Sequence, residues 1–295
     1  MLQDAPRAKT TAIDGLLLVD KPRGVTSHDV VGVARRALRT RRVGHTGTLD
    51  PFATGLLVLL VGRATRLASY VDDEPKVYEA TIAFGAETTT DDLTGEITRT
   101  AERPSVSDVD RAIVSLTGQI EQRPPDFSAK QIAGRRAYAA ARAGEPLALM
   151  PVNVLVHDWR VTHRTPSTLG VTITCGGGTY IRALARDLGR ATNSAAHLTA
   201  LRRIRAGGFD VAAAVTVETL EEVGAAALAP LRTAIAHLPV QLLDTDELRR
   251  ARHGNPIDAR IDAPLAALVD VDGNLVGVAR REATLFQPRV VMHDE

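Results

Sequence analysis

The stretch from Gly44 to Gly62 constrains the fold more than any other part of the chain. Its first twelve residues, GHTGTLDPFATG, include three glycines and a proline, which disfavour regular structure and predict a loop. Six apolar residues, Leu56 to Val61, follow the loop. This run is too short to cross a membrane and is typical of a strand buried on both faces. We therefore expect a central buried strand with a polar loop against it, a common position for a functional site.

One carboxylate, Asp50, stands in this loop directly before Pro51. The pair has two interpretations from residue types alone, because Asp often caps a helix whose first position is Pro, and a rigid loop can also present the acid to a substrate. A carboxylate can act as a nucleophile at an anomeric carbon if it is ionised. A nearby arginine lowers the pKa of a carboxyl group by about 1–3 units. Arg182, which follows the glycine run 176–178, is our candidate.

Length and composition limit the class of protein. The 295 residues, 44% of them hydrophobic, suffice for one large domain and a small one. No basic and then apolar leader precedes Asp14, and no apolar run has the length of a membrane span. We therefore expect a cytoplasmic protein with a disordered tail over residues 1–13. The single cysteine, Cys175, excludes an intramolecular disulfide and a multi-cysteine zinc site.

The net charge of +1 hides a strong asymmetry along the chain. Residues 21–66 contain nine Lys or Arg and two acids, whereas residues 71–126 contain thirteen acids and five basic residues. Residues 182–205 add six arginines with one acid, Asp187. Each basic segment alone could be a solvated helix face. If these segments converge in the fold, they form a groove for a polyanion.

Periodicity predicts a mixture of strands and helices. Residues 76–85 alternate as in a strand with one wet face, and Tyr78 shares a face with Ala80 and Ile82. The other predicted elements are strands over 15–24, 152–161 and 169–175, helices over 109–116 and 131–144, a helix from the glycine run to about residue 189, a basic amphipathic element over 198–205, and short strands after residue 230.

A further helix is predicted directly before the loop of Asp50. Its apolar residues run from Val30 to Leu38 with helical spacing, and Thr26, Ser27 or Asp29 could cap its N-terminus. This helix brings a cluster of arginines to the loop.

No cofactor or metal motif is complete in the sequence. The glycine run 176–178 lies between a predicted strand and a predicted helix, where phosphate is often bound. However, a dinucleotide-binding motif would need glycine where this chain has Ile181, and no phosphate-loop ending Gly-Lys-Ser/Thr occurs. The eight histidines show no metalloprotease spacing, and no serine-hydrolase elbow is present. We therefore expect neither a metal nor a cofactor.

Five motifs occur in order: Leu18-Val19-Asp20-Lys21-Pro22-x-Gly24, Gly44 to Gly55, Lys76-Val77-Tyr78, Gly178-Thr179-Tyr180-Ile181-Arg182 and Leu201-Arg202-Arg203. Together they resemble the bacterial TruB-type tRNA pseudouridine synthases, which modify uridine 55 in the T-loop. The resemblance covers roughly residues 14 to 210. The C-terminal part resembles the small RNA-binding PUA domain.

The resemblance implies a role for each matching position. Asp50 is expected to be the catalytic carboxylate, with Arg182 as its partner, and Tyr78 is expected to stack on the target base and assist proton transfer at the sugar. His45 would enter the T-loop where the extruded base had been, which helps to offset a flipping cost of a few kcal/mol. The residues expected to bind substrate or RNA are Lys21, His45, Lys130, Tyr180, Leu201 and Arg202.

We therefore predict a mixed α/β (α+β) fold with two domains. A pseudouridine-synthase-like catalytic domain with a central mixed or antiparallel sheet is expected over residues 14–234, and a β-rich, PUA-like RNA-binding domain over 235–295. The chain is expected to act on tRNA as a monomer. Two alternatives stay open: a non-catalytic tRNA-binding or tRNA-folding protein on the same scaffold, and a hydrolytic glycosidase, which would need a second acid near Asp50.

Overall fold

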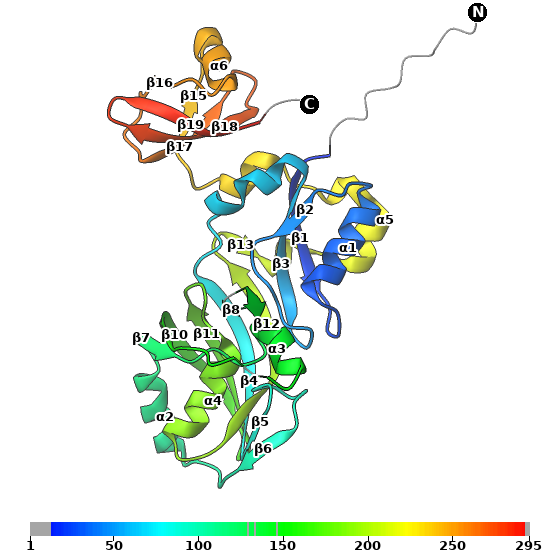
Figure 1. Ribbon diagram of the computed structural model, residues 1–295, viewed down its shortest axis with the longest axis vertical. Coiled ribbons are helices and arrows are strands. Elements are labelled where there is room, and N and C mark those ends of the chain that lie inside the picture. The colour runs from blue at the N-terminus through cyan, green and yellow to red at the C-terminus, as the bar shows by residue number, and fades with distance from the viewer. Residues whose placement is uncertain (1–12, 129, 133, 146, 293–295) are drawn as a thin grey trace, which may run out of the picture.

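The computed structural model describes residues 13–128, 130–132, 134–145 and 147–292. The tail expected over residues 1–13 lies, apart from Ile13, outside the described residues. The molecule is elongated, with a small C-terminal sheet at one end and a large twisted sheet through the rest of its length (Figure 1). Within the described residues, no helix is long and apolar enough to span a membrane.

The large sheet is mixed and has ten strands. Its order is β14-β1-β3-β12-β4-β11-β10-β7, with β13 beside β12 and β2 beside β3. Most neighbours are antiparallel, whereas β1–β14 and β3–β12 are parallel. The strands are β1 (Gly15–Lys21), β2 (Val43–His45), β3 (Thr54–Val61), β4 (Lys76–Phe84), β7 (Gly118–Gln122), β10 (Val152–Arg164), β11 (Thr168–Cys175), β12 (Ala196–Ala206), β13 (Phe209–Asp210) and β14 (Val215–Thr216).

The apolar strand β3 is buried on both faces, as the sequence predicted. Leu57 and Leu59 face α1 (Ser27–Ala37) and α5 (Val217–Val223) in one core cluster. Leu56 and Val58 face the opposite way, into a cluster that continues into the C-terminal sheet. Burying an aliphatic side chain contributes roughly 1.5–3 kcal/mol, so this strand stabilises two layers at once.

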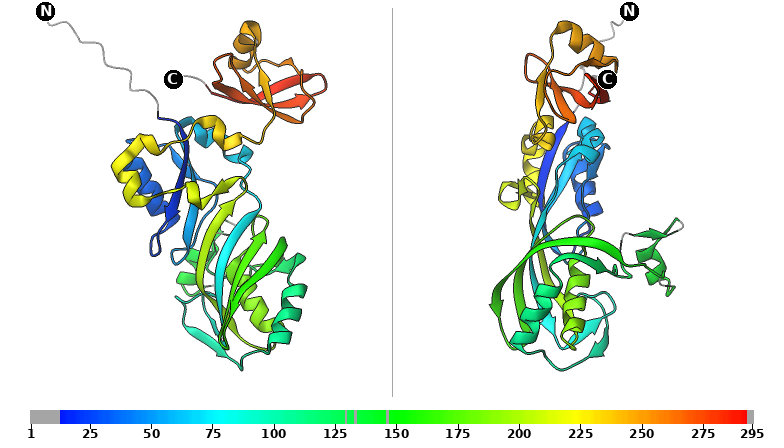
Figure 2. Two further views of the ribbon diagram at one scale, coloured as in Figure 1. Left: turned by 180° about the vertical axis from the view of Figure 1, so that it is seen from behind. Right: turned by 90° about the vertical axis from the view of Figure 1, so that its left-hand side faces the viewer.

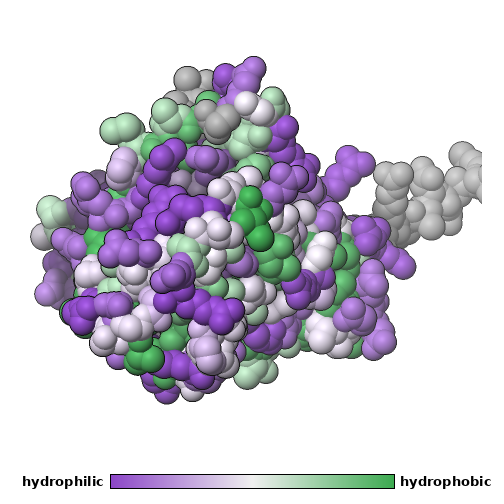
Figure 3. Space-filling model, turned by 90° about the horizontal axis from the view of Figure 1, so that it is seen from below, coloured by the Kyte–Doolittle hydropathy of each residue, from purple (hydrophilic) through white to green (hydrophobic). Residues whose placement is uncertain are grey.

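The other half of the large sheet is covered on one face. There α2 (Val106–Ser115) and α4 (Ile181–Ala191) pack against β4, β10, β11 and β12. Among the described residues, no helix lies on the opposite face of these strands (Figure 2). A hairpin lies beyond this half, at the end farthest from the C-terminal sheet. Its strands are β5 (Ala86–Thr88) and β6 (Ile97–Thr100). Viewed from this end, the surface is mostly hydrophilic, with hydrophobic residues scattered over it (Figure 3).

The two halves of the sheet meet where β3 runs beside β12. The contact is short, with Thr54 opposite Arg202 and Gly55 opposite Arg203. Gly55 has φ +101°, and a Cβ there would lie 2.2 Å from the carbonyl oxygen of Arg203. Glycine is therefore required at this point, for its conformation and for the close approach of two backbones.

The C-terminal sheet packs onto the large one. Leu238, Val269 and Met292 share an apolar cluster with Leu56 of β3, and the Arg66 guanidinium donates a 2.6 Å hydrogen bond to the carbonyl of Val291. The order of this sheet is β15-β17-β18-β19-β16. Its strands are β15 (Val240–Leu242), β16 (Ile257–Asp258), β17 (Leu265–Val269), β18 (Leu275–Glu282) and β19 (Leu285–Val291), and the helix α6 (Thr245–Arg252) follows β15.

Short 3-10 helices connect the two sheets and their strands. They are η1 (Gly62–Tyr70), η2 (Val211–Ala213), η3 (Gly224–Ala227) and η4 (Leu231–Ile235).

The cap of α1 is confirmed, and one predicted helix is confirmed only in its second half. The Thr26 side chain accepts from the N–H of Asp29, whose carboxylate accepts from the N–H of Thr26, a reciprocal capping box. The helix predicted over 131–144 is instead a short hairpin, β8 (Gln131–Ile132) and β9 (Arg135–Arg136), followed by α3 (Ala137–Arg142). Gly134, at φ +79°, turns the chain between the two strands.

Candidate active site

A cavity of about 910 Å³ opens between the two halves of the large sheet. The loop that precedes β3 forms one wall, including Asp50. The start of α4 forms another, and side chains from β4 and β12 line the cavity between them. The residues of the sequence-predicted site that line it are His45, Asp50, Tyr78, Tyr180, Arg182 and Leu201.

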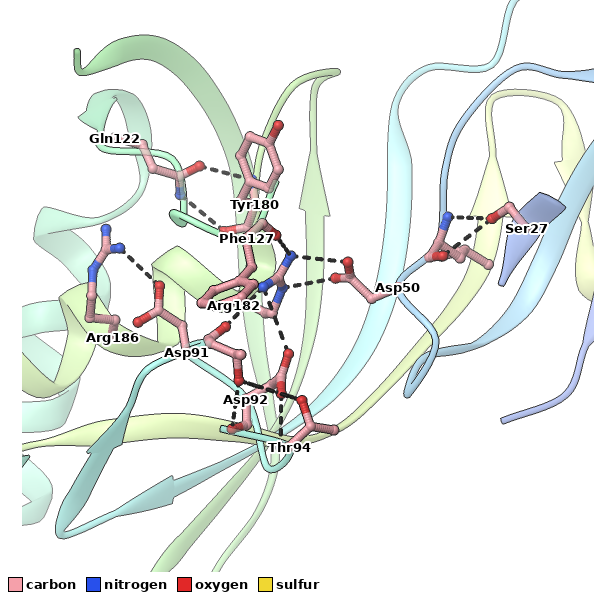
Figure 4. A network of polar contacts seen from close by, with 12 residues as sticks. Ser27, Asp50, Asp91, Asp92, Thr94, Gln122, Phe127, Tyr180, Arg182 and Arg186 are labelled. Carbon is pink, nitrogen blue, oxygen red and sulfur yellow. Dashed lines mark hydrogen bonds and ion pairs between the residues drawn. The ribbon is translucent and has the colours of Figure 1, made fainter. Parts of the chain in front are cut away.

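Asp50 and Arg182 form a two-point ion pair at the base of this cavity (Figure 4). Nε of Arg182 donates to Oδ2 of Asp50 at 2.9 Å, and Nη2 donates to Oδ1 at 3.0 Å. The arginine side chain is 4% exposed, whereas that of Asp50 is 33% exposed. The carboxylate is therefore held rigidly and remains open to a substrate.

The remaining N–H groups of the Arg182 guanidinium donate to backbone carbonyls. Nη1 donates to the carbonyl of Thr90 at 2.8 Å, and Nη2 donates to the carbonyl of Phe127 at 2.8 Å. Oδ2 of Asp92 lies 3.7 Å from Nη1. Figure 4 shows Asp50 and Asp92 approaching the guanidinium from different sides. Arg182 thus has no freedom to leave Asp50 without losing several contacts.

Arg182 is the first of three arginines that recur every four residues along α4. This spacing places them on one helix face, and each meets an acid of residues 87–92. The pairs are Arg182 with Asp92, Arg186 with Asp91 and Arg190 with Glu87.

The six arginines of residues 182–205 therefore do not form the open basic groove that we expected there. Five of them pair with carboxylates; besides the three on α4, Arg202 pairs with Asp20 and Arg205 with Asp210. Part of the acidic segment 71–126 thus neutralises α4, and fixes it in place.

The direction of the Asp50 pKa also differs from our expectation. Burial raises the pKa of Asp50 above its ordinary value, and the charge and hydrogen bonds of Arg182 oppose this rise without reversing it. We predicted a lowered pKa because we considered the arginine alone. The sequence could not show how deeply the loop is buried.

Tyr78 and Leu201 both line the cavity. They come from the adjacent antiparallel strands β4 and β12, and each is 7% exposed. Burial raises the pKa of the Tyr78 hydroxyl. Tyr180, the N-cap residue of α4, stands on the wall, where Gln122 exchanges hydrogen bonds with its backbone N–H and C=O.

Lys21 does not reach the surface, so our prediction that it contacts RNA is wrong. The side chain is fully buried, and Nζ donates to the carbonyls of Val25 at 2.8 Å, Pro22 at 3.0 Å and Pro51 at 3.4 Å. Burial lowers the pKa of Lys21 to about 8, although the charge of Asp50 opposes this. Lys21 supports the loop directly after Asp50.

The remaining predicted residues take different positions. His45 is half-buried at the cavity, and burial lowers the pKa of its imidazole. Arg202 lies outside the cavity, where it makes a two-point ion pair with Asp20 at 2.6 and 3.0 Å. Lys130 is half-buried just before β8 and does not line the cavity.

Our sequence reasoning missed Arg203, which lines the cavity. It is 2% exposed, and it donates to the carbonyl of Leu56 at 2.7 Å and to that of Gly47 at 3.1 Å. A signal for it existed, since alternate residues of a strand share a face. Arg203 follows Leu201 by two positions, so of the two adjacent arginines it is the one that shares the face of Leu201.

The described residues include no group of three or more His, Cys, Asp or Glu side chains that could hold a metal ion. Among its described lining residues, the cavity instead offers one carboxylate, Asp50, in a fixed two-point pair and one buried phenol, Tyr78. It also contains a buried arginine, Arg203, which bonds to two backbone carbonyls. Such a site can direct a carboxylate at a bound sugar while a hydroxyl handles a proton.

Comparisons with known proteins agree with this picture. Residues 35–181 match the family model described as TruB family pseudouridylate synthase (N terminal domain), and residues 182–239 match that of the tRNA pseudouridylate synthase B C-terminal domain. The boundary between the two models falls within α4 and is no boundary of the large sheet.

Two curated relatives are similar over almost the whole chain. The tRNA pseudouridine synthase B of Thermobifida fusca is 45% identical over 292 residues, which cover 94% of this chain and 98% of the relative. That of an Arthrobacter species is 43% identical and covers 95% and 96%. A solved H/ACA RNP bound to a substrate RNA containing 2′-deoxyuridine shares the fold, with a TM-score of 0.72 at 21% identity, covering 95% of this chain and 85% of that one.

Proposed function

The chain belongs to the TruB family of pseudouridylate synthases, and from this premise we propose that it isomerises uridine to pseudouridine in tRNA. The target is uridine 55 of the T-loop. The observation that carries the proposal for the site is the two-point pair of Asp50 and Arg182 at the base of an open cavity. This pair sets a carboxylate in one orientation before substrate arrives.

The reaction exchanges one bond for another within a nucleotide. The bond from C1′ of the ribose to N1 of the uracil breaks, and a bond from C1′ to C5 forms. C5 then loses its hydrogen as a proton, and N1 gains one, so no oxidant, reductant or co-reactant is consumed. Asp50 acts on the sugar, either as the nucleophile at C1′ or by assisting the departure of the base.

The other cavity residues position the nucleotide. Tyr78 stacks on the flipped base, and its hydroxyl assists proton transfer at the sugar. Leu201 forms an apolar floor and Tyr180 a wall, and their position in the cavity lining supports these roles. His45 takes the place of the extruded base in the T-loop, which offsets part of the cost of flipping.

Further parts of the chain bind the rest of the tRNA. Residues 235–295 form a PUA-like RNA-binding domain beside a catalytic domain over 14–234, and the protein acts as a monomer in the cytoplasm. Basic residues around α1, among them Arg36, Arg39 and Arg41, supply contacts to phosphates.

A non-catalytic RNA-binding protein on the same scaffold would not need a carboxylate that is held in place and open to the cavity. Burial of a carboxylate costs free energy that only function or a structural contact would offset, and the pair with Arg182 leaves one third of the Asp50 side chain exposed in the cavity. A glycosidase would need a second acid free to protonate a leaving group. Asp92 is not such an acid, because its Oδ1 accepts hydrogen bonds from Thr90 and Thr94.

The test is to map the product. A tRNA transcript incubated with the protein is treated with carbodiimide and then alkali, which leaves an adduct only on pseudouridine, and reverse transcription is read for a stop. We expect a stop at position 55 that is lost when the transcript carries cytidine there. A stop elsewhere would overturn the assigned position, and no stop at all would overturn the activity.

A further inference from the structure

Arg203 differs from every other arginine of residues 182–205. The other five pair with carboxylates. Arg203 is 2% exposed, and no carboxylate partner for it exists among the described residues. A buried charge is costly without an oppositely charged partner. This charge is therefore retained for a reason other than the pairing that explains its neighbours.

The Arg203 guanidinium is held in a fixed orientation. Nε donates to the carbonyl of Leu56 at 2.7 Å, and Nη2 donates to the carbonyl of Gly47 at 3.1 Å. Nη1 lies 3.1 Å from the point that a Cβ at Gly47 would occupy, so glycine leaves room for the guanidinium. These contacts place the positive charge between the loop of Asp50 and the strands below it.

Tyr78 lies directly across from Arg203. The two residues are Cα partners in the antiparallel pair of β12 and β4, and both line the cavity. Directly opposed side chains of an antiparallel pair lie about 5 Å apart at Cβ. Tyr78 is almost fully buried, so its surroundings govern the charge that its oxygen can carry.

The charged and titratable groups that influence the Tyr78 hydroxyl come from the loop and from three strands. Asp50 lies in the loop, Cys175 on β11 and Arg203 on β12, and Lys76 of its own strand β4 lines the same cavity. Burial raises the pKa of Tyr78, the charges of Cys175 and Asp50 raise it further, and Arg203 lowers it. Arg203 is thus the group that opposes the other three influences.

We propose that Arg203 is a positioning residue that stabilises negative charge on the Tyr78 oxygen and so makes Tyr78 a competent proton acceptor at the sugar. The inference rests on the proposed function, in which Tyr78 handles a proton of the ribose. Tyr78, in its ionised form, takes a proton from the ribose and returns it after the C1′–C5 bond forms, so Tyr78 ends as it began and the reaction remains an isomerisation. The two arginines then have different roles: Arg182 holds Asp50, and Arg203 stabilises negative charge on Tyr78.

The experiment compares Arg203→Gln and Arg203→Lys with the wild type. Gln removes the charge but keeps hydrogen-bond donors for the loop, whereas Lys keeps the charge but loses the planar fork. Arg205→Gln is the matched control, because it removes the same charge from β12 at an exposed residue paired with Asp210. Single-turnover rates and KM for tRNA are measured across pH, and circular dichroism confirms folding.

A second readout needs no activity. Protein with ¹³C-labelled tyrosine rings is titrated by NMR without tRNA, and Tyr78→Phe identifies the Tyr78 signal. We expect Tyr78 to ionise at higher pH in Arg203→Gln, and its rate to fall about tenfold for each pKa unit of that shift with little change in KM. Arg203→Lys and Arg205→Gln should titrate close to the wild type.

Three outcomes would overturn the proposal. One is a folded Arg203→Gln whose pH–rate profile and Tyr78 titration coincide with those of the wild type. Another is a rise in KM alone, which would make Arg203 a phosphate contact of the RNA. The third is an equal loss of rate in Gln and Lys variants with an unshifted Tyr78, which would reduce Arg203 to a support of the loop. If the wild type makes no pseudouridine, the proposed function fails, while the titration still tests the influence of Arg203 on Tyr78.

Discussion

Asp50 and Arg182, 132 positions apart in the chain, meet through two parallel hydrogen bonds of 3.0 and 2.9 Å. Asp50 belongs to the loop before β3, and Arg182 belongs to the first turn of α4. The pair therefore joins the two halves of the large sheet across the cavity. Any change that loosens it is expected to affect the chemistry before it affects the fold.

Arg182→Lys should lower the single-turnover rate about 10- to 100-fold, because lysine cannot reproduce the fork and losing a charge-assisted hydrogen bond costs roughly 1.5–3 kcal/mol. The matched control is Arg190→Lys on the same helix, where the arginine is 55% exposed and pairs with Glu87. Arg190→Lys should have the single-turnover rate and the melting temperature of the wild type. Equal losses in the two variants would mean that the helix, not the pair, is sensitive.

The raised pKa of Asp50 predicts where activity is lost in acid. Burial disfavours the ionised form in spite of Arg182, so Asp50 takes up its proton at a higher pH than an ordinary aspartate does. Because the reaction requires the carboxylate, kcat/KM should decline on acidification before the pH reaches the usual aspartate range. A profile that stays flat down to that range, with folding intact, would contradict this.

Lys21→Met should destabilise the protein by roughly 2–4 kcal/mol, since the carbonyls of Val25 and Pro22 lose a charged donor. The destabilisation caused by Lys21→Met should be larger above pH 8. The pKa of Lys21 is lowered to about 8 in the folded protein, so the unfolded chain binds more protons above that pH, and the wild type gains stability as pH rises. Urea titrations at several pH values measure this, and a loss that is constant with pH would refute it.

Gly55→Ala tests the junction of the two half-sheets. A Cβ there would meet the backbone of Arg203 at 2.2 Å, in addition to the strain of φ +101°. Gly118→Ala is the control, because Gly118 has φ +91° but nothing within 4 Å of the added carbon. The control should lose about 1–2 kcal/mol from conformation alone, and Gly55→Ala distinctly more. Equal unfolding free energies would show that the close approach does not matter.

The sequence predicted the elements that depend on local pattern. The glycines and the apolar run identified the loop and β3, and Thr26 and Asp29 identified the start of α1. The helix over 131–144 was right only for residues 137–142, because the turn at Gly134 makes the first part of the segment a hairpin.

The site was predictable where a motif marks a residue, and not where burial decides its role. Asp50 and Arg182 were paired correctly from their motifs. The pKa direction of Asp50 and the position of Lys21 depend on how tightly distant segments pack. No local pattern encodes that packing. Arg203 is the intermediate case, because strand alternation from Leu201 contained the necessary signal.

The most direct measurement is the release of tritium from tRNA whose uridines are tritiated at C5, because forming the C1′–C5 bond expels that hydrogen. Wild type is compared with Asp50→Asn, together with the tRNA affinity of each. We predict release by the wild type and none by Asp50→Asn, at affinities within a few-fold of one another. Release by Asp50→Asn at the wild-type rate, or tight binding of tRNA without release by either protein, would contradict the account.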